Sequence, residues 1–248
     1  IWFLIAYWAN TSIINSATGS KPLNRRENKR VYNLVENLCM SQGMKMPKIN
    51  IIYDSSLNAF ASGINERTYT VTLSEGIIRK LNDEELEAVI AHELSHIRNR
   101  DVRLLIISIV FVGIFSMLTE ITFYAITHIR VRSNNKGSGG VFLFILIALV
   151  IAAIGYLFAS LMRFAISRKR EYMADAGSAE MTKNPLALAN ALRKISADPA
   201  IEAVERKDVA QLFIQNPKKN SKSIFSGLSG LFATHPPIEK RIEILEQF

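Results

Sequence analysis

Residues 81–96 read LNDEELEAVIAHELSH, and this stretch predicts a helix that begins at about Asp83. Asn82 is a suitable N-cap residue, and Glu85, three positions later, can return the hydrogen bond as in a capping box. The apolar residues that follow recur at helical spacing: Leu86, Val89 and Ile90. One face of the helix is therefore expected to pack against a core, so the residues at its end stand on a rigid frame.

The end of this stretch carries two of the chain's four histidines, His92 and His96. Positions i and i+4 lie on the same face of a helix, so both imidazoles can converge on one metal ion at about 2.0–2.1 Å. Glu93 leaves the helix rotated by about 100° from His92 and points beside such an ion, where a base acting on water has to be. His-Glu-x-x-His on a helix is typical of zinc metalloproteases. The alternative is a helix face that carries two histidines and no metal, because three fixed positions can match by chance.

A catalytic zinc usually takes three protein ligands, so a third ligand is expected elsewhere in the chain. The metzincin pattern needs a histidine six residues after His96 and is excluded, because that residue is Val102. The carboxylates of REYMAD, residues 170–175, remain as candidates, since Glu171 and Asp175 are four positions apart on one predicted helix. Glu171 could bind the ion, and Asp175 could accept the second ring N–H of a ligating histidine. The same spacing equally fits a solvated helix face that pairs with neighbouring arginines.

Hydrophobic residues make up 49% of the 248-residue chain and concentrate in two long stretches. Residues 104–126 contain one charge, Glu120, and residues 141–162 contain none. Each stretch exceeds the roughly 20 residues that cross a bilayer, so together they predict a transmembrane hairpin, the alternative being long buried helices. His128 lies in the connection and would then be across the membrane from His92. Glu120 is near the hairpin tip and is expected to reach the membrane interface.

The net charge of +8 points to an anionic partner. Seven basic residues flank the hairpin and three lie in its connection: Arg98, Arg100, Arg103, Arg163, Arg168, Lys169 and Arg170 against Arg130, Arg132 and Lys136. The positive-inside rule places the flanks in the cytoplasm, and membrane headgroups are the expected partner. Nucleic acid is not expected, because no basic stretch is interleaved with aromatic residues on a recognisable module. Cys39 is the only cysteine, which excludes an intramolecular disulfide and suits a reducing compartment.

The remainder of the chain reads as mainly helical with one small sheet. Helices are predicted at residues 25–43, from about Asp83, at 168–179, from Pro185 and from Pro236, and strands at 48–54 and 68–74. Residues 1–18 read as the remainder of an earlier membrane span.

Four segments, in their order along the chain, resemble the HtpX-type membrane metalloproteases, which are bacterial relatives of the type I CAAX prenyl proteases. These segments are NAFASG (58–63), HELSHIRNRD (92–101), EYMAD (171–175) and THPPIEKRI (234–242). The resemblance covers about residue 45 to the C-terminus. It implies a mainly α fold with a small β-sheet: a membrane-anchored, gluzincin-like metalloprotease whose transmembrane helical hairpin is inserted between the two halves of the zinc site. The family has two N-terminal spans, of which this chain retains at most part of one.

The resemblance also implies one Zn²⁺ per chain. His92, His96 and Glu171 are its expected ligands, with Asp175 as the residue that supports a ligand. Glu93 is the expected general base, which takes a proton from the attacking water and returns it to the leaving amine.

Three further roles are expected around this site. His235 would donate to the oxyanion, because it is the only other histidine expected on the zinc side; its alternative role is to cap the last helix. Arg241 would assist, since the related prenyl proteases carry a histidine and an arginine at this spacing. Asn58, Ala59 and Phe60 could supply an exposed edge strand to which an extended substrate adds through its main chain, which implies broad specificity.

The expected organisation is therefore a remnant of a span (1–18), the first part of the catalytic domain (19–103), the hairpin (104–162) and the second part of the catalytic domain (163–248). The implied function is that of a zinc-dependent endopeptidase of the bacterial inner membrane that cleaves misfolded membrane proteins on the cytoplasmic side during stress. Two alternatives stay open: a specific processing protease of the CAAX-prenyl type and a catalytically inactive membrane scaffold. The intact Glu93 argues against the scaffold, and the small number of spans argues against a transporter.

Overall fold

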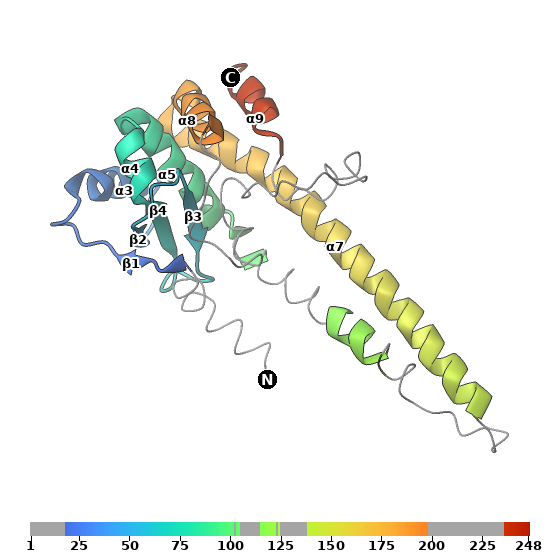
Figure 1. Ribbon diagram of the computed structural model, residues 1–248. Helices are drawn as coiled ribbons and strands as arrows, with labels where there is room; N and C mark the ends of the chain where they lie inside the picture. The colour runs from blue at the N-terminus through green and yellow to red at the C-terminus, as the bar shows by residue number, and fades with distance from the viewer. Residues whose placement is uncertain (1–17, 102, 105–114, 123, 125–137, 198–235) are drawn as a thin grey trace. The chain divides into compact units, whose positions relative to one another are not determined.

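The computed structural model describes residues 18–101, 103, 104, 115–122, 124, 138–197 and 236–248 (Figure 1). The chain divides into two compact units. The first combines Ile1–Leu104 with Ser167–Phe248, and the second is Leu105–Ile166.

Four strands form the sheet of the first unit (Figure 1): β1 (Lys21–Pro22), β2 (Lys48–Ile52), β3 (Ala59–Ser62) and β4 (Thr70–Ser74). Their order is β1-β2-β4-β3, with β2 and β4 parallel and the two outer strands antiparallel to their neighbours. The two strands predicted from alternating apolar residues are the central pair. Every residue of β4 is buried, as is usual for a strand that is covered on both faces.

Two helices flank the central strands in sequence. α3 (Lys29–Ser41) is shorter than predicted because Asn28 caps it: the Asn28 side chain accepts a hydrogen bond from the Val31 N–H. Just past its end, Gly43 has a φ of 61°, the left-handed conformation that a glycine adopts at little cost. α4 (Glu75–Lys80) was not predicted and follows β4 directly.

α5 (Asp83–Arg98) begins with the predicted capping box. The Glu85 N–H donates to the Asn82 side chain at 2.8 Å, and the Asn82 N–H donates to the Glu85 carboxylate at 3.0 Å. α5 contacts α3, β3, β4 and α8, so it lies at the centre of the first unit (Figure 1). Residues 91–95 are all buried, which is why this helix can hold polar side chains in fixed positions.

Three helices complete the described chain: α7 (Ser138–Thr182), α8 (Pro185–Ala197) and α9 (Ile238–Leu245). The predicted helix at 168–179 lies inside α7, which is continuous through both units. α7 approaches α5 at a glycine, because a Cβ on Gly177 would lie 2.0 Å from the Ser95 Oγ. The Ser178 hydroxyl also donates to the Ala88 carbonyl at 2.7 Å. This close crossing brings residues of α7 beside the end of α5.

The second unit contains a helical segment at 115–122 and the first part of α7, which meet where Gly155 faces the Phe115 ring. Its large apolar side chains are exposed, among them Met117, Ile121, Tyr124, Leu143, Ile147, Val150, Ile151, Ile154 and Leu157. Among the described residues, no helix has the length and hydropathy that crossing a membrane requires. Residues 1–17 of the predicted remnant at 1–18 and most of the first predicted span lie outside the described residues.

Candidate metal centre

The two histidines of α5 present their outer nitrogens to each other. The Nε2 atoms of His92 and His96 are 3.2 Å apart, and the rings stand at 90° with centroids 4.8 Å apart. This is the consequence of the i, i+4 spacing on a helix that is otherwise buried. Both side chains therefore direct a nitrogen at one point.

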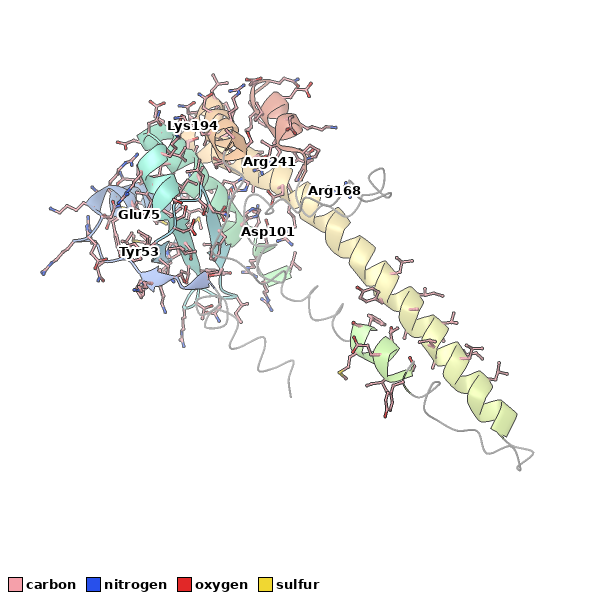
Figure 2. The ribbon with its side chains drawn as sticks, in the orientation of Figure 1. Tyr53, Glu75, Asp101, Arg168, Lys194 and Arg241 are labelled. Carbon is pink, nitrogen blue, oxygen red and sulfur yellow. The ribbon has the colours of Figure 1, made fainter. Side chains whose placement is uncertain are left out.

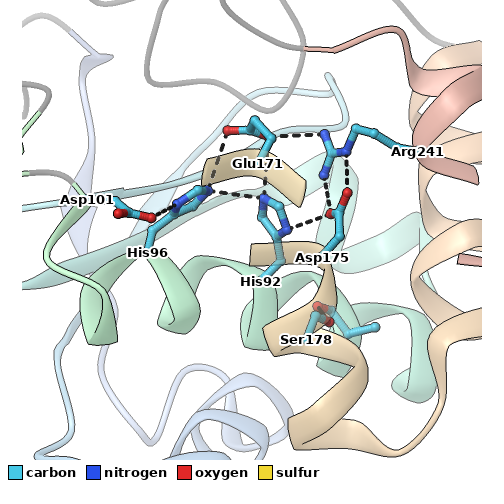
Figure 3. Close-up of polar contacts among 8 residues, drawn as sticks. His92, His96, Asp101, Glu171, Asp175, Ser178 and Arg241 are labelled. Atoms are coloured by element: carbon cyan, nitrogen blue, oxygen red, sulfur yellow. Dashed lines mark hydrogen bonds and ion pairs between the residues drawn. The ribbon is translucent and has the colours of Figure 1, made fainter. Parts of the chain in front are cut away.

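Glu171 lies on α7, in the second of the two segments that make up the first unit, and its carboxylate faces the two Nε2 atoms (Figure 3). One carboxylate oxygen lies 3.7 Å from the His92 Nε2, and the other lies 3.6 Å from the His96 Nε2. Ligand atoms of the three residues all lie within 4.8 Å of one another. Tetrahedral zinc with bonds of about 2.0–2.1 Å separates its ligand atoms by about 3.3 Å, so the three residues are spaced as a metal site requires.

The inner nitrogen of each histidine faces a carboxylate. The Nδ1 of His92 is 3.0 Å from the Asp175 Oδ1, and the Nδ1 of His96 is 2.9 Å from the Asp101 Oδ2. These carboxylates fix the tautomers, because an ionised carboxylate only accepts, so each Nδ1 must carry the proton. Both Nε2 lone pairs then point at each other and at Glu171. Such a set of acceptors is stabilised by a cation between them, and the residues present fit a divalent metal.

Each of these carboxylates faces an arginine in turn, and Figure 3 shows the pairing of Asp175 with Arg241. Arg241 of α9 donates two hydrogen bonds to Asp175, at 2.8 and 2.6 Å, and its third nitrogen is 3.2 Å from Glu171. The Nε of Arg170 is 2.8 Å from Asp101. Each histidine therefore contacts an aspartate that is itself bound to an arginine.

The charges around the site are unbalanced without a cation. Four carboxyl groups and two arginines surround it: Glu93, Asp101, Glu171 and Asp175 with Arg170 and Arg241. With neutral imidazoles and ionised carboxylates, two negative charges remain, which a divalent cation would balance. Burial alone would raise the pKa of Asp175, but the charge of Arg241 and hydrogen bonds from His92 and Arg241 outweigh it and hold that pKa below its ordinary value.

Glu93 is only 3% exposed and lies between the histidines and the edge strand. The backbone N–H of Ala61 in β3 donates a hydrogen bond to its carboxylate. Burial raises the pKa of Glu93, while the adjacent imidazoles and this hydrogen bond oppose the rise. A buried carboxylate of this kind is suited to accept a proton.

The NAFASG segment lies beside this carboxylate as the edge strand β3. Asn58, Ala59 and Phe60 were expected to form an exposed edge strand, but all three are buried, backbone included, with Ala59 at 0% exposed. The Asn58 carbonyl accepts from the Ser74 N–H at 2.9 Å, toward β4. Because backbone groups alternate along an antiparallel strand, those of Ala59 and Ala61 point away from β4, toward the outer edge of the sheet.

His235 and Arg241 were also expected to act near the metal. His235 lies outside the described residues, so its role at the oxyanion stays a prediction. Arg241 is 1% exposed and bound to Asp175 and Glu171, and its assistance at the oxyanion stays a prediction. Asp101 and Arg170 were not predicted. Asp101, labelled in Figure 2, falls after α5 has ended, where Arg100 takes a left-handed φ of 57° and turns the chain back toward His96.

Comparison with known proteins agrees with this geometry. The family model described as peptidase family M48 matches residues 25–248. The chain is 76% identical over 249 residues to a "Protease HtpX homolog" of Bacteroides fragilis, covering 100% of this chain and 77% of that protein. It is 39% identical over 251 residues to a protein of the same name from Lactobacillus helveticus, covering 99% and 82%. Among solved structures, that of S. mikatae Ste24p has a similar fold, with a TM-score of 0.55 at 21% identity, over 98% of this chain and 55% of the other.

Proposed function

The chain belongs to peptidase family M48 and is a metalloendopeptidase of the HtpX type, and on that premise we propose that it uses zinc to cleave membrane and misfolded proteins at the cytoplasmic face of the bacterial inner membrane. The observation that carries the zinc site is the convergence of two Nε2 atoms and one carboxylate at separations of 3.2–3.7 Å. Both imidazoles are oriented by carboxylates so that only acceptor atoms face the centre.

In this proposal His92, His96 and Glu171 would hold the zinc, which would supply the Lewis acidity that lets a water molecule react at neutral pH. Glu93 takes the proton from the attacking water and passes it to the leaving amine. Its burial and its fixed hydrogen bond to the Ala61 N–H keep the carboxylate in one orientation for both transfers. His235 is proposed as the donor to the oxyanion.

The substrate is proposed to add to the outer edge of β3 as an extended strand, which requires that edge to be uncovered first, since Ala59 is 0% exposed. Ala59 and Ala61 point their backbone groups to that edge, and the Ala61 N–H already reaches the carboxylate of Glu93. A peptide paired here would therefore run past the base. Recognition through the main chain favours broad specificity, as degradation of misfolded proteins requires.

The membrane location is proposed from the second unit and the flanking charges. Apolar side chains such as Ile151 and Ile154 are more than half exposed to their surroundings. Lipid is the environment that would accept them, since soluble proteins rarely expose so many together. The excess of arginine and lysine on the flanks supports a cytoplasmic position for the metal site.

The decisive experiment compares metal content and cleavage in two variants of α7. Purified chain should hold about one zinc and cleave casein in a chelator-sensitive way. Glu171→Gln should lose tightly bound zinc and cleavage together. Glu180→Gln, which removes a carboxylate exposed on the same helix, is the control and should keep both. Full zinc content and cleavage in Glu171→Gln would remove Glu171 from the ligand set.

A further inference from the structure

A groove of about 980 Å³ lies at the C-terminal end of α5, on the first unit. Three chain segments line it: the turn after α3 at Gly43–Lys45, the β3–β4 connection at Ile64–Tyr69, and the end of α5 with the residues just after it. The last segment contributes Ile97, Arg98, Arg100 and Arg103. None of these residues belongs to the metal centre. The groove is therefore a separate feature of the surface.

The groove is strongly basic. Its walls carry five cationic side chains and one carboxylate, Glu66: the cations are Lys45, Arg67, Arg98, Arg100 and Arg103. All five are exposed, and Arg98, which binds Glu180 at 3.0 Å, is the one with an ion-pair partner among the described residues. Asp101 follows Arg100 in the sequence, but its carboxylate is buried and contacts His96 and Arg170. The positive charge of the groove is thus left for an external anion.

The position of the groove in the chain indicates which anion this is. Arg103 directly precedes the apolar stretch that begins at Leu104, so the groove stands where the chain would enter the bilayer. Arginine forks match phosphate oxygens in a bidentate manner, and basic clusters beside a membrane segment attract anionic headgroups. Apolar walls from Met44, Ile64 and Ile97 could receive the glycerol region of a lipid.

We infer that this groove binds the phosphate headgroup of an anionic phospholipid. The inference rests on the proposed membrane location but not on the proposed zinc chemistry. An acidic segment of a protein substrate is the competing ligand, because β3 leads into the β3–β4 connection that forms one wall. The chain sequence favours the lipid, since three of the five cations lie within six residues before the apolar stretch.

The test measures lipid binding to the full chain purified in a nonionic detergent. Native mass spectrometry would follow titration with dioctanoyl phosphatidylglycerol, dioctanoyl phosphatidylcholine and free glycerol 3-phosphate. The groove variant combines Arg67→Gln, Arg100→Gln and Arg103→Gln. Its matched control removes three exposed charges elsewhere, with Arg26→Gln, Lys29→Gln and Lys80→Gln. At about 1 kcal/mol per basic residue, the groove variant should bind phosphatidylglycerol on the order of 100-fold more weakly at low salt.

Each outcome is decisive. Weak binding confined to the groove variant, with phosphatidylcholine bound poorly throughout, supports the inference. Equal loss in the control variant would show a diffuse electrostatic effect and overturn it, as would free glycerol 3-phosphate binding as tightly as the lipid. Unchanged lipid binding with slower cleavage of acidic substrates alone would assign the groove to substrate instead. Casein cleavage by the same preparations reports on the zinc site, so failure of that proposal is seen separately.

Discussion

Asp101 faces the Nδ1 of His96 in the same way that Asp175 faces the Nδ1 of His92. Substitution of Asp101 is therefore the sharpest single-residue test of whether these aspartates orient the histidines. Asp101→Asn keeps a hydrogen-bond acceptor 2.9 Å from the His96 Nδ1 but removes the negative charge that also faces Arg170. Loss of such a partner typically lowers metal affinity by about 10–100-fold. We expect a zinc affinity lower by that factor, measured by competition with a fluorescent chelator, with secondary structure unchanged.

Asp54→Asn is the control for Asp101→Asn, because Asp54 is half-buried, accepts a hydrogen bond from the Ser56 N–H, and is remote in sequence from the proposed ligands. A merely structural role for Asp101 would lower stability without changing zinc affinity. Wild-type affinity in Asp101→Asn would show that the second aspartate does not orient its histidine.

Glu93→Gln tests the base independently of the metal. Glutamine has nearly the shape of glutamate and can still accept the hydrogen bond from the Ala61 N–H, but it cannot take a proton from water. We expect a full complement of zinc and a loss of casein cleavage by at least about 100-fold, the usual contribution of a general base. Cleavage at the wild-type rate by zinc-loaded Glu93→Gln would exclude the role.

The residues of the metal site that the sequence predicted are those related by helical spacing. His92, His96, Glu171 and Asp175 are pairs at i and i+4, so their shared faces could be inferred before the helices were seen. Asp101 could not be found in this way, because its direction depends on the left-handed turn at Arg100 after α5 ends. Arg241 was placed near the metal by resemblance alone, and its binding to Asp175 depends on how α9 packs.

Among the elements, the crossing of α5 and α7 sets the distance between the two histidines and Glu171. Gly177→Ala would place a methyl group 2.0 Å from the Ser95 Oγ and 3.1 Å from its Cβ, so the Ser95 hydroxyl must rotate away and the two helices must also yield slightly. Overpacking of this kind costs about 1–3 kcal/mol in unfolding free energy. We expect lower stability in chemical unfolding and weaker zinc binding, because the proposed ligands lie on both helices.

Ser95→Ala separates this packing effect from any other effect of the alanine. The Ser95 hydroxyl is buried and its removal alone should change stability little, whereas it opens space for the methyl group on residue 177. The double variant should therefore recover about 1 kcal/mol relative to Gly177→Ala. Additive losses in the two variants would show that the close contact does not limit the crossing.

The elements that the sequence predicted are those with long periodic patterns or clear caps. α5 begins at its capping box, and β2 and β4 follow their apolar residues. β1 has two residues and includes Pro22, so no periodicity could reveal it, and its pairing with β2 is a tertiary effect. α4 has only six residues and lacks a pattern long enough to recognise.

For the whole molecule, the metal site joins two chain segments that are separated by the second unit. His96 and Glu171 belong to different segments, so a bound ion should stabilise the first unit by holding them together. At free zinc about 1,000 times the dissociation constant, the gain is about 4 kcal/mol. We expect chelation to lower the melting temperature of the wild-type chain markedly and that of Glu171→Gln little. An unchanged melting temperature in wild-type chain shown to be metal-free would contradict this coupling.

The membrane proposal makes its own prediction at Ile151, which lies at the middle of the apolar stretch 141–162 and is 63% exposed. If lipid surrounds this side chain, Ile151→Arg should cost about 3 kcal/mol of insertion free energy, whereas Ile151→Leu should cost almost nothing. We expect the arginine variant to lose much of its carbonate-resistant membrane fraction and the leucine variant to keep it. An exposed isoleucine in water would give the opposite result, because arginine would then be tolerated and both variants would fractionate alike.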